Sequence, residues 1–271
     1  MNLFDDAGNL LPTHIVASQD TILGIFKQWQ PIVNARAGKS AHSDKQDGSP
    51  VTETDHAVEA AVQAEMAQHY PTLAVYGEES GYPEVLPRVF WMIDPIDGTK
   101  SFIQGVPAYT SMAALIQDGQ AIASIIYNPA LDIAYTARIG EGAYKDGARL
   151  DLTTMPMATH ALCKDRFVAQ LSAELDGTGV VCKDGPSGGG YGFSLVANGE
   201  VAARFNLHGG GYIHDYAPGA LLVSEAGGDI IEYSGTPYTY QSKTFVACHP
   251  ALSDAIRDLV PLLRDIESQR D

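Results

Sequence analysis

The sequence has few basic residues and no long apolar run free of charge. Lys and Arg total 17 against 33 Asp and Glu, a formal net charge of −16. Such a charge repels nucleic acid and attracts cations. The apolar runs also fall short of the roughly 18 residues that a membrane-spanning helix needs. We therefore expect neither a nucleic acid nor a membrane as a partner.

Cysteine is equally scarce. Cys163, Cys182 and Cys248 are far apart in the chain and match neither a C-x-x-C pair nor a disulfide framework. The first 13 residues, MNLFDDAGNLLPT, carry no basic segment followed by an apolar one, as an export signal would. We expect a cytoplasmic protein whose cysteines are small buried hydrophobic residues.

The length of 271 residues and a hydrophobic content of 45% suit one large domain or two closely packed halves. Apolar periodicity predicts helices over 13–37 and 54–69. The polar, glycine-containing stretch 38–50 reads as a mobile loop. Five apolar runs separated by turn signals then predict an antiparallel sheet. These runs are residues 73–76, 89–93, 111–116, 121–127 and 133–137.

A second α/β half is expected to follow. Its predicted strands are 179–182, 201–205, 229–233 and 244–248. A helix is predicted from Pro218 to the glycine pair 227–228, and a last amphipathic helix over 253–266. We therefore divide the chain into an N-terminal α+β half, 1–150, and a C-terminal α/β half, 151–271, with an interface near residue 150.

The stretch WMIDPIDGTKSF, residues 91–102, places Asp94 and Asp97 after an apolar strand. Two carboxylates about 4 Å apart repel by roughly 4 kcal/mol at an effective dielectric constant near 20. A shared proton or a divalent cation can offset this repulsion. Oxygen ligands without His or Cys favour Mg²⁺, with Mn²⁺ or Ca²⁺ next. The alternative is a tight turn in which Asp97 caps a helix.

Further acids stand at the ends of other predicted elements. Glu78 follows a strand in YGEES, and Asp215 stands directly before the helix that Pro218 can open. If a helix or turn begins after Asp97, the N–H groups of Gly98 and Thr99 can bind phosphate oxygens. These acids predict a cradle for two cations, a common device for phosphoryl transfer. Simple helix capping remains the alternative for each acid taken alone.

Together and in order, these stretches resemble the inositol monophosphatase family of metal-dependent phosphatases. The matching segments are SPVTETDHAVE at 49–59, YGEES at 76–80, WMIDPIDGTKSF at 91–102, GEGAYKDG at 140–147 and HDYAPGALLVSEAGG at 214–228. The resemblance implies an α+β fold, a layered α-β-α-β-α sandwich. It also implies a homodimer, with the active site where the two halves of each chain meet.

The resemblance further assigns roles by position. Glu78, Asp94 and the main-chain carbonyl of Ile96 would hold one Mg²⁺, and Asp94 with Asp97 and Asp215 a second. A third, weaker ion would bind at Glu78. The catalytic residues would be Asp55, Thr99 and Glu78, with Asp55 and Thr99 orienting the attacking water. The substrate-binding residues would be Asp97, Gly98, Thr99, Ser187, Asn206, His208 and Asp215.

Three positions depart from the family's inositol phosphatases. His214 stands where Trp is common, Lys100 replaces a more usual Thr, and Asn206 or His208 stands where a Glu would contact the polyol. The resemblance as a whole implies a Mg²⁺-dependent, lithium-sensitive hydrolase of a small polyol or sugar-like phosphate resembling inositol 1-phosphate, whereas these three departures point away from inositol phosphate itself. Histidinol phosphate and 3′(2′)-phosphonucleotides are alternative substrates within the same superfamily.

Two alternatives belong to other classes. The stretch GPSGG, residues 185–189, formally satisfies G-x-S-x-G, which would make Ser187 the nucleophile of a serine hydrolase. That motif needs a helix after the serine, and GGGYG is expected to open a helix poorly and to form a flexible loop over the substrate instead. A noncatalytic metal-binding partner module is the other alternative, although it would have no use for the Asp55–Thr99 pair.

Overall fold

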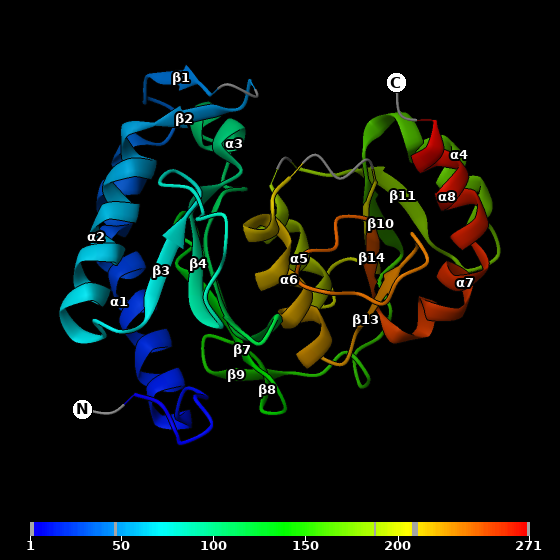
Figure 1. The fold of residues 1–271 in the computed structure, drawn as a ribbon. Helices are drawn as coiled ribbons and strands as arrows, with labels where there is room; N and C mark the ends of the chain where they lie inside the picture. The colour runs from blue at the N-terminus through cyan, green and yellow to red at the C-terminus, as the bar shows by residue number, and fades with distance from the viewer. Residues whose placement is uncertain (1–2, 46–47, 187, 208–210, 270–271) are drawn as a thin grey trace.

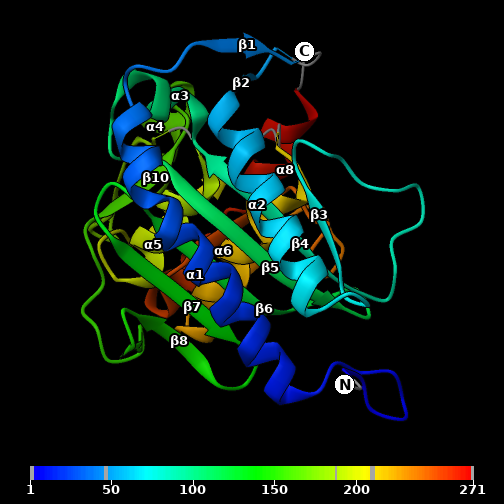
Figure 2. The ribbon, with the colours of Figure 1, turned by 90° about the vertical axis from the view of Figure 1, so that its left-hand side faces the viewer.

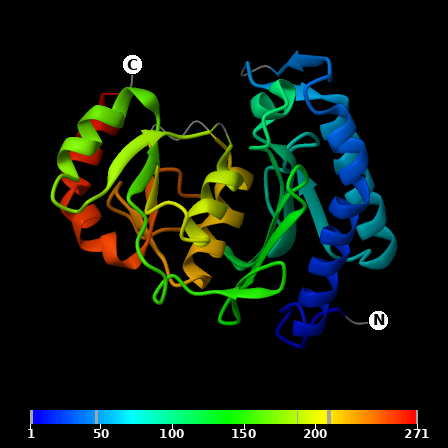
Figure 3. The same cartoon turned by 180° about the vertical axis from the view of Figure 1, so that it is seen from behind.

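The computed structural model describes residues 3–45, 48–186, 188–207 and 211–269. Figures 1 and 3 show five layers in the order helix, sheet, helix, sheet, helix. The helices are α1 (Pro12–Arg36), α2 (Glu53–His69), α3 (Thr99–Gln104), α4 (Val168–Glu174), α5 (Gly189–Ala197), α6 (Ile213–Glu225), α7 (Ser253–Asp258) and α8 (Val260–Ser268), with short 3₁₀ turns η1 (Asp165–Phe167) and η2 (Pro250–Leu252). The expected layered α+β sandwich is confirmed.

Two mixed sheets form the second and fourth layers. The first contains β3 (Ala74–Gly77), β4 (Val89–Asp97), β5 (Thr110–Gln117), β6 (Gln120–Asn128), β7 (Ile133–Arg138), β8 (Gly142–Lys145) and β9 (Ala148–Leu150), in that order. The second contains β10 (His160–Cys163), β11 (Val181–Asp184), β12 (Ala203–Asn206), β13 (Asp229–Glu232) and β14 (Phe245–Cys248), in the order β11-β10-β12-β14-β13. The predicted antiparallel arrangement holds except for β3, which runs parallel to β4.

Helices α1 and α2 lie side by side across the outer face of the first sheet (Figure 2). Ile22 and Phe26 of α1 and Val58 and Val62 of α2 are buried in one cluster with Trp91 of β4. Because α5 and α6 cover the opposite face, β4 is buried along its whole length. A continuous apolar run is what a strand covered on both faces requires.

Two predicted segments differ from the structure. Residues 38–50 are not all loop, because β1 (His42–Asp44) pairs antiparallel with β2 (Pro50–Thr52). Helix α6 begins at Ile213, five residues before Pro218, which lies inside the helix rather than at its start. Among the described residues, no helix is long and apolar enough to cross a membrane.

Candidate active site

Asp94 and Asp97 lie at the end of β4, on either side of an irregularity in its pairing with β5. Asp94 pairs with Met112, whereas Asp97 pairs with Thr110. Between them the Asp94 Oδ1 accepts a hydrogen bond of 3.0 Å from the Ile96 N–H. Such irregularities re-aim side chains near functional sites. As a result both carboxylates are buried, at 1% and 4% exposure, and lie close together.

The Asp97 carboxylate is held by the start of helix α5. Its Oδ1 accepts the Gly189 N–H and its Oδ2 accepts the Gly190 N–H, both at 2.8 Å. The Thr110 hydroxyl also donates to Oδ2, at 3.1 Å. Free N–H groups and the helix dipole at an N-terminus both favour a carboxylate. A Cβ atom at Gly189 would lie 2.2 Å from the Asp215 carbonyl oxygen, so this close approach requires glycine.

This contact corrects two interpretations of the sequence. The glycine run does open a helix, because Asp97 supplies from another part of the chain the cap that the local sequence lacks. Asp97 does not cap the helix that follows it, since the N-cap of α3 is Gly98, with φ of 81°. Ser187, the nucleophile of the serine-hydrolase alternative, lies outside the described residues.

Glu78 is positioned by a turn that is fastened to α2. The Glu59 carboxylate accepts the N–H groups of Glu79, at 2.9 Å, and Ser80, at 2.8 Å. A Cβ atom at Gly77 would lie 2.0 Å from the Glu59 carboxyl carbon, so glycine is required there. No helix starts at this turn, which excludes a helix-start role for its acids.

A lysine from the β1–β2 hairpin meets this acid pair. Lys45 Nζ lies 2.6 Å from Glu78 Oε1 and 2.8 Å from Glu79 Oε1. Burial alone would lower the pKa of Lys45, but the hydrogen bonds and charges of the two glutamates outweigh it and raise that pKa. A protonated amine therefore contacts a carboxylate that the sequence assigns to a metal.

Asp215 is the third residue of α6, not the residue before the helix. Its Oδ2 accepts the Tyr212 N–H at 2.5 Å, so the carboxylate does cap the helix that carries it. Its Oδ1 lies 3.8 Å from His214 Nε2. Asp215 therefore caps its helix and also lies in the cluster with Asp94 and Asp97, so both alternatives hold for this residue.

His214 is the most buried imidazole near the cluster, at 2% exposure. Its Nδ1 lies 2.9 Å from the Tyr82 hydroxyl, and its ring stacks on the rings of Tyr82 and Tyr212. Burial lowers the pKa of His214 to about 4, against the opposing influence of Glu78. The imidazole is therefore neutral at pH 7.

Asp55 and Thr99 each have a partner. Asp55 Oδ2 accepts the Thr52 N–H at 2.9 Å and also the Thr52 hydroxyl, closing a capping box at the start of α2. The Thr99 hydroxyl donates to the Ile96 carbonyl at 3.1 Å. Burial raises the pKa of Asp55 to about 6, although its hydrogen bonds to Thr52 oppose the shift.

The buried carboxylates raise one another's pKa values. Burial, followed by the charge of Glu78, holds the pKa of Asp94 well above its usual range. Burial raises the pKa of Asp97 to about 6, with Asp215 as the next cause. Burial also raises the pKa of Asp215 to about 7, against its hydrogen bond from the Tyr212 N–H. A proton or a cation shared among these acids would reduce the repulsion between their carboxylates.

Two groups of side chains have the spacing of a metal site. Asp94, Asp97 and Asp215 each offer an oxygen, and Glu78, Asp94 and His214 each offer one ligand atom; within each group these atoms lie within 4.8 Å of one another. The second group includes a buried imidazole nitrogen that has no hydrogen-bond partner among the described residues. The crowded carboxylates and this nitrogen fit divalent cations.

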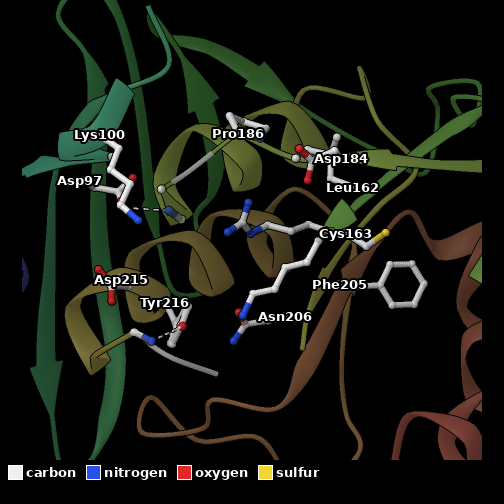
Figure 4. Close-up of a pocket in the computed structure, with 17 residues that line it drawn as sticks. Asp97, Lys100, Leu162, Cys163, Asp184, Pro186, Phe205, Asn206, Asp215 and Tyr216 are labelled. Carbon is white, nitrogen blue, oxygen red and sulfur yellow. Dashed lines mark hydrogen bonds between the residues drawn. The ribbon is translucent and has the colours of Figure 1, made fainter. Parts of the chain in front are cut away.

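A cavity of about 490 Å³ opens beside the cluster (Figure 4). Asp97, Gly98 and Asp215 line it on one side, and Asn206 of β12 lines it on another. The Asn206 amide donates to the Lys243 carbonyl at 2.5 Å. The predicted substrate residues Ser187 and His208 lie outside the described residues.

The model of the inositol monophosphatase family matches residues 15–265. The chain belongs to the inositol monophosphatase family. Members of this family are metal-dependent phosphatases that hydrolyse phosphate monoesters, so the enzyme class expected from the sequence is confirmed. The residues matched extend from α1 to α8 and include every acid of the cluster.

Relatives within the family include two proteins of Mycobacterium tuberculosis. The chain is 29% identical over 232 residues to a probable inositol 1-monophosphatase, ImpA, covering 77% of this chain and 81% of that protein. It is 31% identical over 211 residues to a histidinol-phosphatase, covering 70% of this chain and 77% of that protein. Sequence similarity thus extends to family members that carry different substrate names.

Solved structures of inositol monophosphatases have the same fold. The Thermotoga maritima enzyme matches with a TM-score of 0.79 at 21% identity, covering 91% of this chain and 98% of that one. An IMPase/NADP phosphatase complexed with Mg²⁺ and phosphate matches with a TM-score of 0.76 at 18% identity, covering 90% and 95%. These similarities establish the fold of the chain.

Several residues of this family member were not singled out as part of the site from its sequence. The sequence predicts Lys45 in a loop and gives no local reason to place Arg204 or Phe193 at the site. His214 stands out in the sequence only as a departure from Trp. The sequence does show these residues, because His214 stands next to Asp215 and Arg204 lies in a predicted strand. The residues around each of them, however, do not show in which direction the side chain points.

Proposed function

We propose that this protein is a Mg²⁺-dependent hydrolase that releases inorganic phosphate from a small polyol or sugar-like phosphate monoester. One observation carries the proposal. The buried Asp94 and Asp97 of β4 and the half-buried Asp215 of α6 meet in one cluster beside a cavity large enough for a small ester. Acids from distant parts of the chain converge in this way where cations are bound.

The ligand sets of the proposal combine the observed grouping of the acids with the family resemblance, which supplies the Ile96 carbonyl and the third ion. Asp94, Asp97 and Asp215 would hold one ion, and Glu78, Asp94 and the Ile96 carbonyl another, with a third, weaker ion at Glu78. When bound, divalent cations lower the pKa of water and neutralise negative charge on a transferring phosphoryl group. Mn²⁺ can substitute for Mg²⁺ at oxygen ligands.

Asp55 and Thr99 supply the proton chemistry of the proposal. Thr52 holds Asp55 Oδ2 and leaves Oδ1 to accept a proton from the attacking water, which is possible because a carboxyl with a pKa of about 6 is mostly ionised at pH 7. The Thr99 hydroxyl orients that water. The water oxygen bonds to phosphorus as its proton passes to Asp55 Oδ1, the ester P–O bond breaks, and the leaving alkoxide takes a proton from solvent water to depart as the alcohol.

Histidinol phosphate is a second candidate substrate. It is supported by the 31% identity to a histidinol-phosphatase, together with Asn206 or His208 at the position where an acid is expected to contact a polyol. We further propose a homodimer inhibited by lithium, on family resemblance. A cytoplasmic location without nucleic-acid partners is supported by three free, buried cysteines and the net charge of −16.

A phosphate-release assay tests the proposal. Purified protein would be assayed with inositol 1-phosphate, histidinol phosphate and a 3′-phosphonucleotide, each with Mg²⁺, with Mg²⁺ plus lithium, or with EDTA. We expect release that requires Mg²⁺ and is absent in Asp94→Asn. Release that persists in EDTA, or in folded Asp94→Asn protein, would contradict it. Sedimentation of the same sample measures the oligomeric state.

A further inference from the structure

The orientation of His214 indicates a role beyond aromatic packing. Its ring lies between Tyr82 and Tyr212, with centroid separations of 5.9 and 5.5 Å and interplanar angles of 11° and 22°. Nδ1 faces the Tyr82 hydroxyl at 2.9 Å. The opposite nitrogen, Nε2, is buried without a hydrogen-bond partner among the residues described. Buried polar atoms are normally satisfied, so this one requires an explanation.

Nε2 faces the carboxylates. It lies 3.8 Å from Glu78 Oε2 and 3.8 Å from Asp215 Oδ1, too far for a hydrogen bond to either. Ligand atoms about 2.1 Å from one ion stand about 3 Å apart in neighbouring positions and about 4.2 Å apart in opposite ones. The observed separations fall between these two values. They suit two ligands of one ion better than two partners in a hydrogen bond.

We propose that His214 Nε2 is a metal ligand that joins Glu78 and Asp94 in a mixed nitrogen–oxygen site, and that this site selects Mn²⁺, Co²⁺ or Zn²⁺ over Mg²⁺. Imidazole favours transition-metal ions, whereas carboxylates suit Mg²⁺ and Mn²⁺. The neighbouring group of Asp94, Asp97 and Asp215 has oxygen ligands only and keeps its preference for Mg²⁺. The two sites are therefore chemically different.

Tyr82 supports this assignment. For Nε2 to offer its lone pair, the proton must sit on Nδ1 and be donated to the Tyr82 hydroxyl, and the 2.9 Å contact permits this. Ligating imidazoles usually donate their other N–H in this manner, which fixes the tautomer and the ring orientation. Tyr82 is thus a positioning residue for His214.

Pulsed electron paramagnetic resonance of protein loaded with Mn²⁺ tests the proposal without turnover. We expect ¹⁴N coupling to Mn²⁺ in the wild type, its loss in both His214→Gln and His214→Phe, and its retention in His69→Gln, which alters an exposed histidine of α2. Titration calorimetry should show Mn²⁺ affinity reduced at least tenfold in the His214 variants, with Mg²⁺ affinity changed much less. Tyr82→Phe should keep the coupling and weaken Mn²⁺ binding about tenfold.

Bound Mn²⁺ without nitrogen coupling, equal losses of Mg²⁺ and Mn²⁺ affinity, or no Mn²⁺ binding by folded wild-type protein would each overturn the inference. Circular dichroism establishes that the variants fold. The inference shares its acids with the proposed function but does not depend on turnover. Nitrogen coupling in a protein that releases no phosphate would refute the proposed phosphatase and leave the ligand assignment standing.

The cavity carries a second, independent signal. Lys100, Lys164 and Arg204 line it, while the only acid there apart from Asp97 and Asp215, among the described lining residues, is Asp184. Basic residues are scarce in the chain, with 17 Lys and Arg against 33 Asp and Glu. Three basic side chains around one cavity are therefore a local concentration of positive charge. Lys100 and Asp184 are labelled in Figure 4.

Arg204 is held in place by packing. Its guanidinium carbon lies 5.2 Å from the centre of the Phe193 ring, and a Cβ atom at Gly192 would lie 2.1 Å from its Nη1. Its Nε is buried and has no hydrogen-bond partner among the described residues. A guanidinium held against an aromatic ring is pre-organised to bind a planar anion.

We infer that the non-reacting part of the substrate carries a second anionic group, a carboxylate or a phosphate, and that Arg204 binds it. This inference rests on the proposed function. Arginine binds carboxylate and phosphate through paired N–H donors. A polyol hydroxyl could also accept a hydrogen bond from Nε, but only an anion placed at Arg204 would in addition bring a negative charge to the guanidinium.

The matched esters 3-phosphoglycerate and glycerol 3-phosphate differ only in a carboxylate against a hydroxymethyl group. We expect kcat/KM at least tenfold higher for 3-phosphoglycerate, and that ratio to fall to about one in Arg204→Met and Arg204→Gln. Arg166→Met is the control, because Arg166 also lies over a phenylalanine ring, that of Phe167, but does not line the cavity. Equal ratios in wild-type and Arg204 variants would overturn the inference.

Calorimetric titration of the wild type and of Arg204→Met with each ester tests the anion site separately from the phosphatase activity. Stronger binding of 3-phosphoglycerate to the wild type alone, without turnover of either ester, would refute the phosphatase but support the anion site. Turnover of both esters with no preference would support the phosphatase and refute the anion site.

Discussion

The Gly189 backbone N–H donates to Asp97 Oδ1 at 2.8 Å, joining the end of β4 to the start of α5. A candidate metal ligand is thereby fixed by a helix that begins 92 residues later in the chain. Because α5 packs on α6, which carries Asp215, the same contact sets the distance between two acids of the cluster. The geometry of the site therefore depends on the packing of the two halves.

Replacing Gly189 with Ala should disturb that packing. The new Cβ would lie 2.2 Å from the Asp215 carbonyl oxygen, so α5 must move away from Asp97. We expect a loss of about 1 to 3 kcal/mol in the free energy of unfolding, and weaker Mg²⁺ binding. Urea denaturation and calorimetry measure the two effects. Gly24→Ala on α1 meets nothing within 4 Å and is the matched control, expected to stabilise the protein by up to about 1 kcal/mol.

Replacing Lys45 with Gln should strengthen cation binding. Lys45 Nζ contacts Glu78 and Glu79, so a divalent ion at Glu78 competes with the ammonium group. We expect a higher Mn²⁺ or Mg²⁺ affinity and a less stable metal-free protein, as measured by calorimetry and by denaturation in EDTA. Lys27→Gln removes the same charge from an exposed part of α1. Equal cation affinity in both variants would show that Lys45 does not compete.

Replacing Asp94 with Asn should separate activity from stability. Asp94 is buried among other acids, which hold its pKa well above the usual range. Its neutral isostere removes repulsion from the metal-free protein and a ligand from both candidate metal sites. We expect phosphate release to fall below detection while the metal-free protein becomes harder to unfold at pH 7. A variant that unfolds more easily than the wild type in EDTA would contradict this account.

The sequence was sufficient for the main strands of the first sheet and for the acids, because both follow from local patterns, whereas the order of the layers came from the family resemblance. The run before Asp94 is apolar throughout, which predicts a strand covered on both faces, and the acids stand at the ends of such elements. The start of α5 could not be predicted from its own glycines. Its cap is Asp97, and only the folded chain brings that carboxylate to Gly189 and Gly190.

The same limit applies to orientation. Pro218 predicts a helix start that leaves Asp215 just before the helix. In the structure α6 begins at Ile213, and Asp215 both caps this helix and faces the cluster. His214 appeared in the sequence as a substitution. Its role depends on Tyr82, which lies 132 residues away in the chain and turns Nε2 towards the acids. No pattern in the sequence gives that direction.

The stability of the metal-free protein should fall as the pH rises from about 4 to about 7. Burial raises the pKa of Asp55 and of Asp97 to about 6, and that of Asp215 to about 7, from an unfolded value of 3.8. An acid with a raised pKa in the folded state binds its proton more tightly when folded. Its stabilising contribution is therefore complete below pH 4 and is lost as the pH rises through the folded pKa.

For Asp55 alone, a shift from 3.8 to about 6 corresponds to about 3 kcal/mol lost across that window. Urea denaturation in EDTA at pH 4, 5, 6 and 7 measures the slope, and Asp55→Asn should flatten it. Saturating Mg²⁺ should restore stability at pH 7, because the cation replaces the protons among the clustered acids. Burial lowers the pKa of His214 to about 4, which adds stability as the pH rises, so the decisive comparison is between wild type and Asp55→Asn. Equal slopes in the two proteins between pH 4 and pH 7 would mean that Asp55 does not bind its proton more tightly in the folded state.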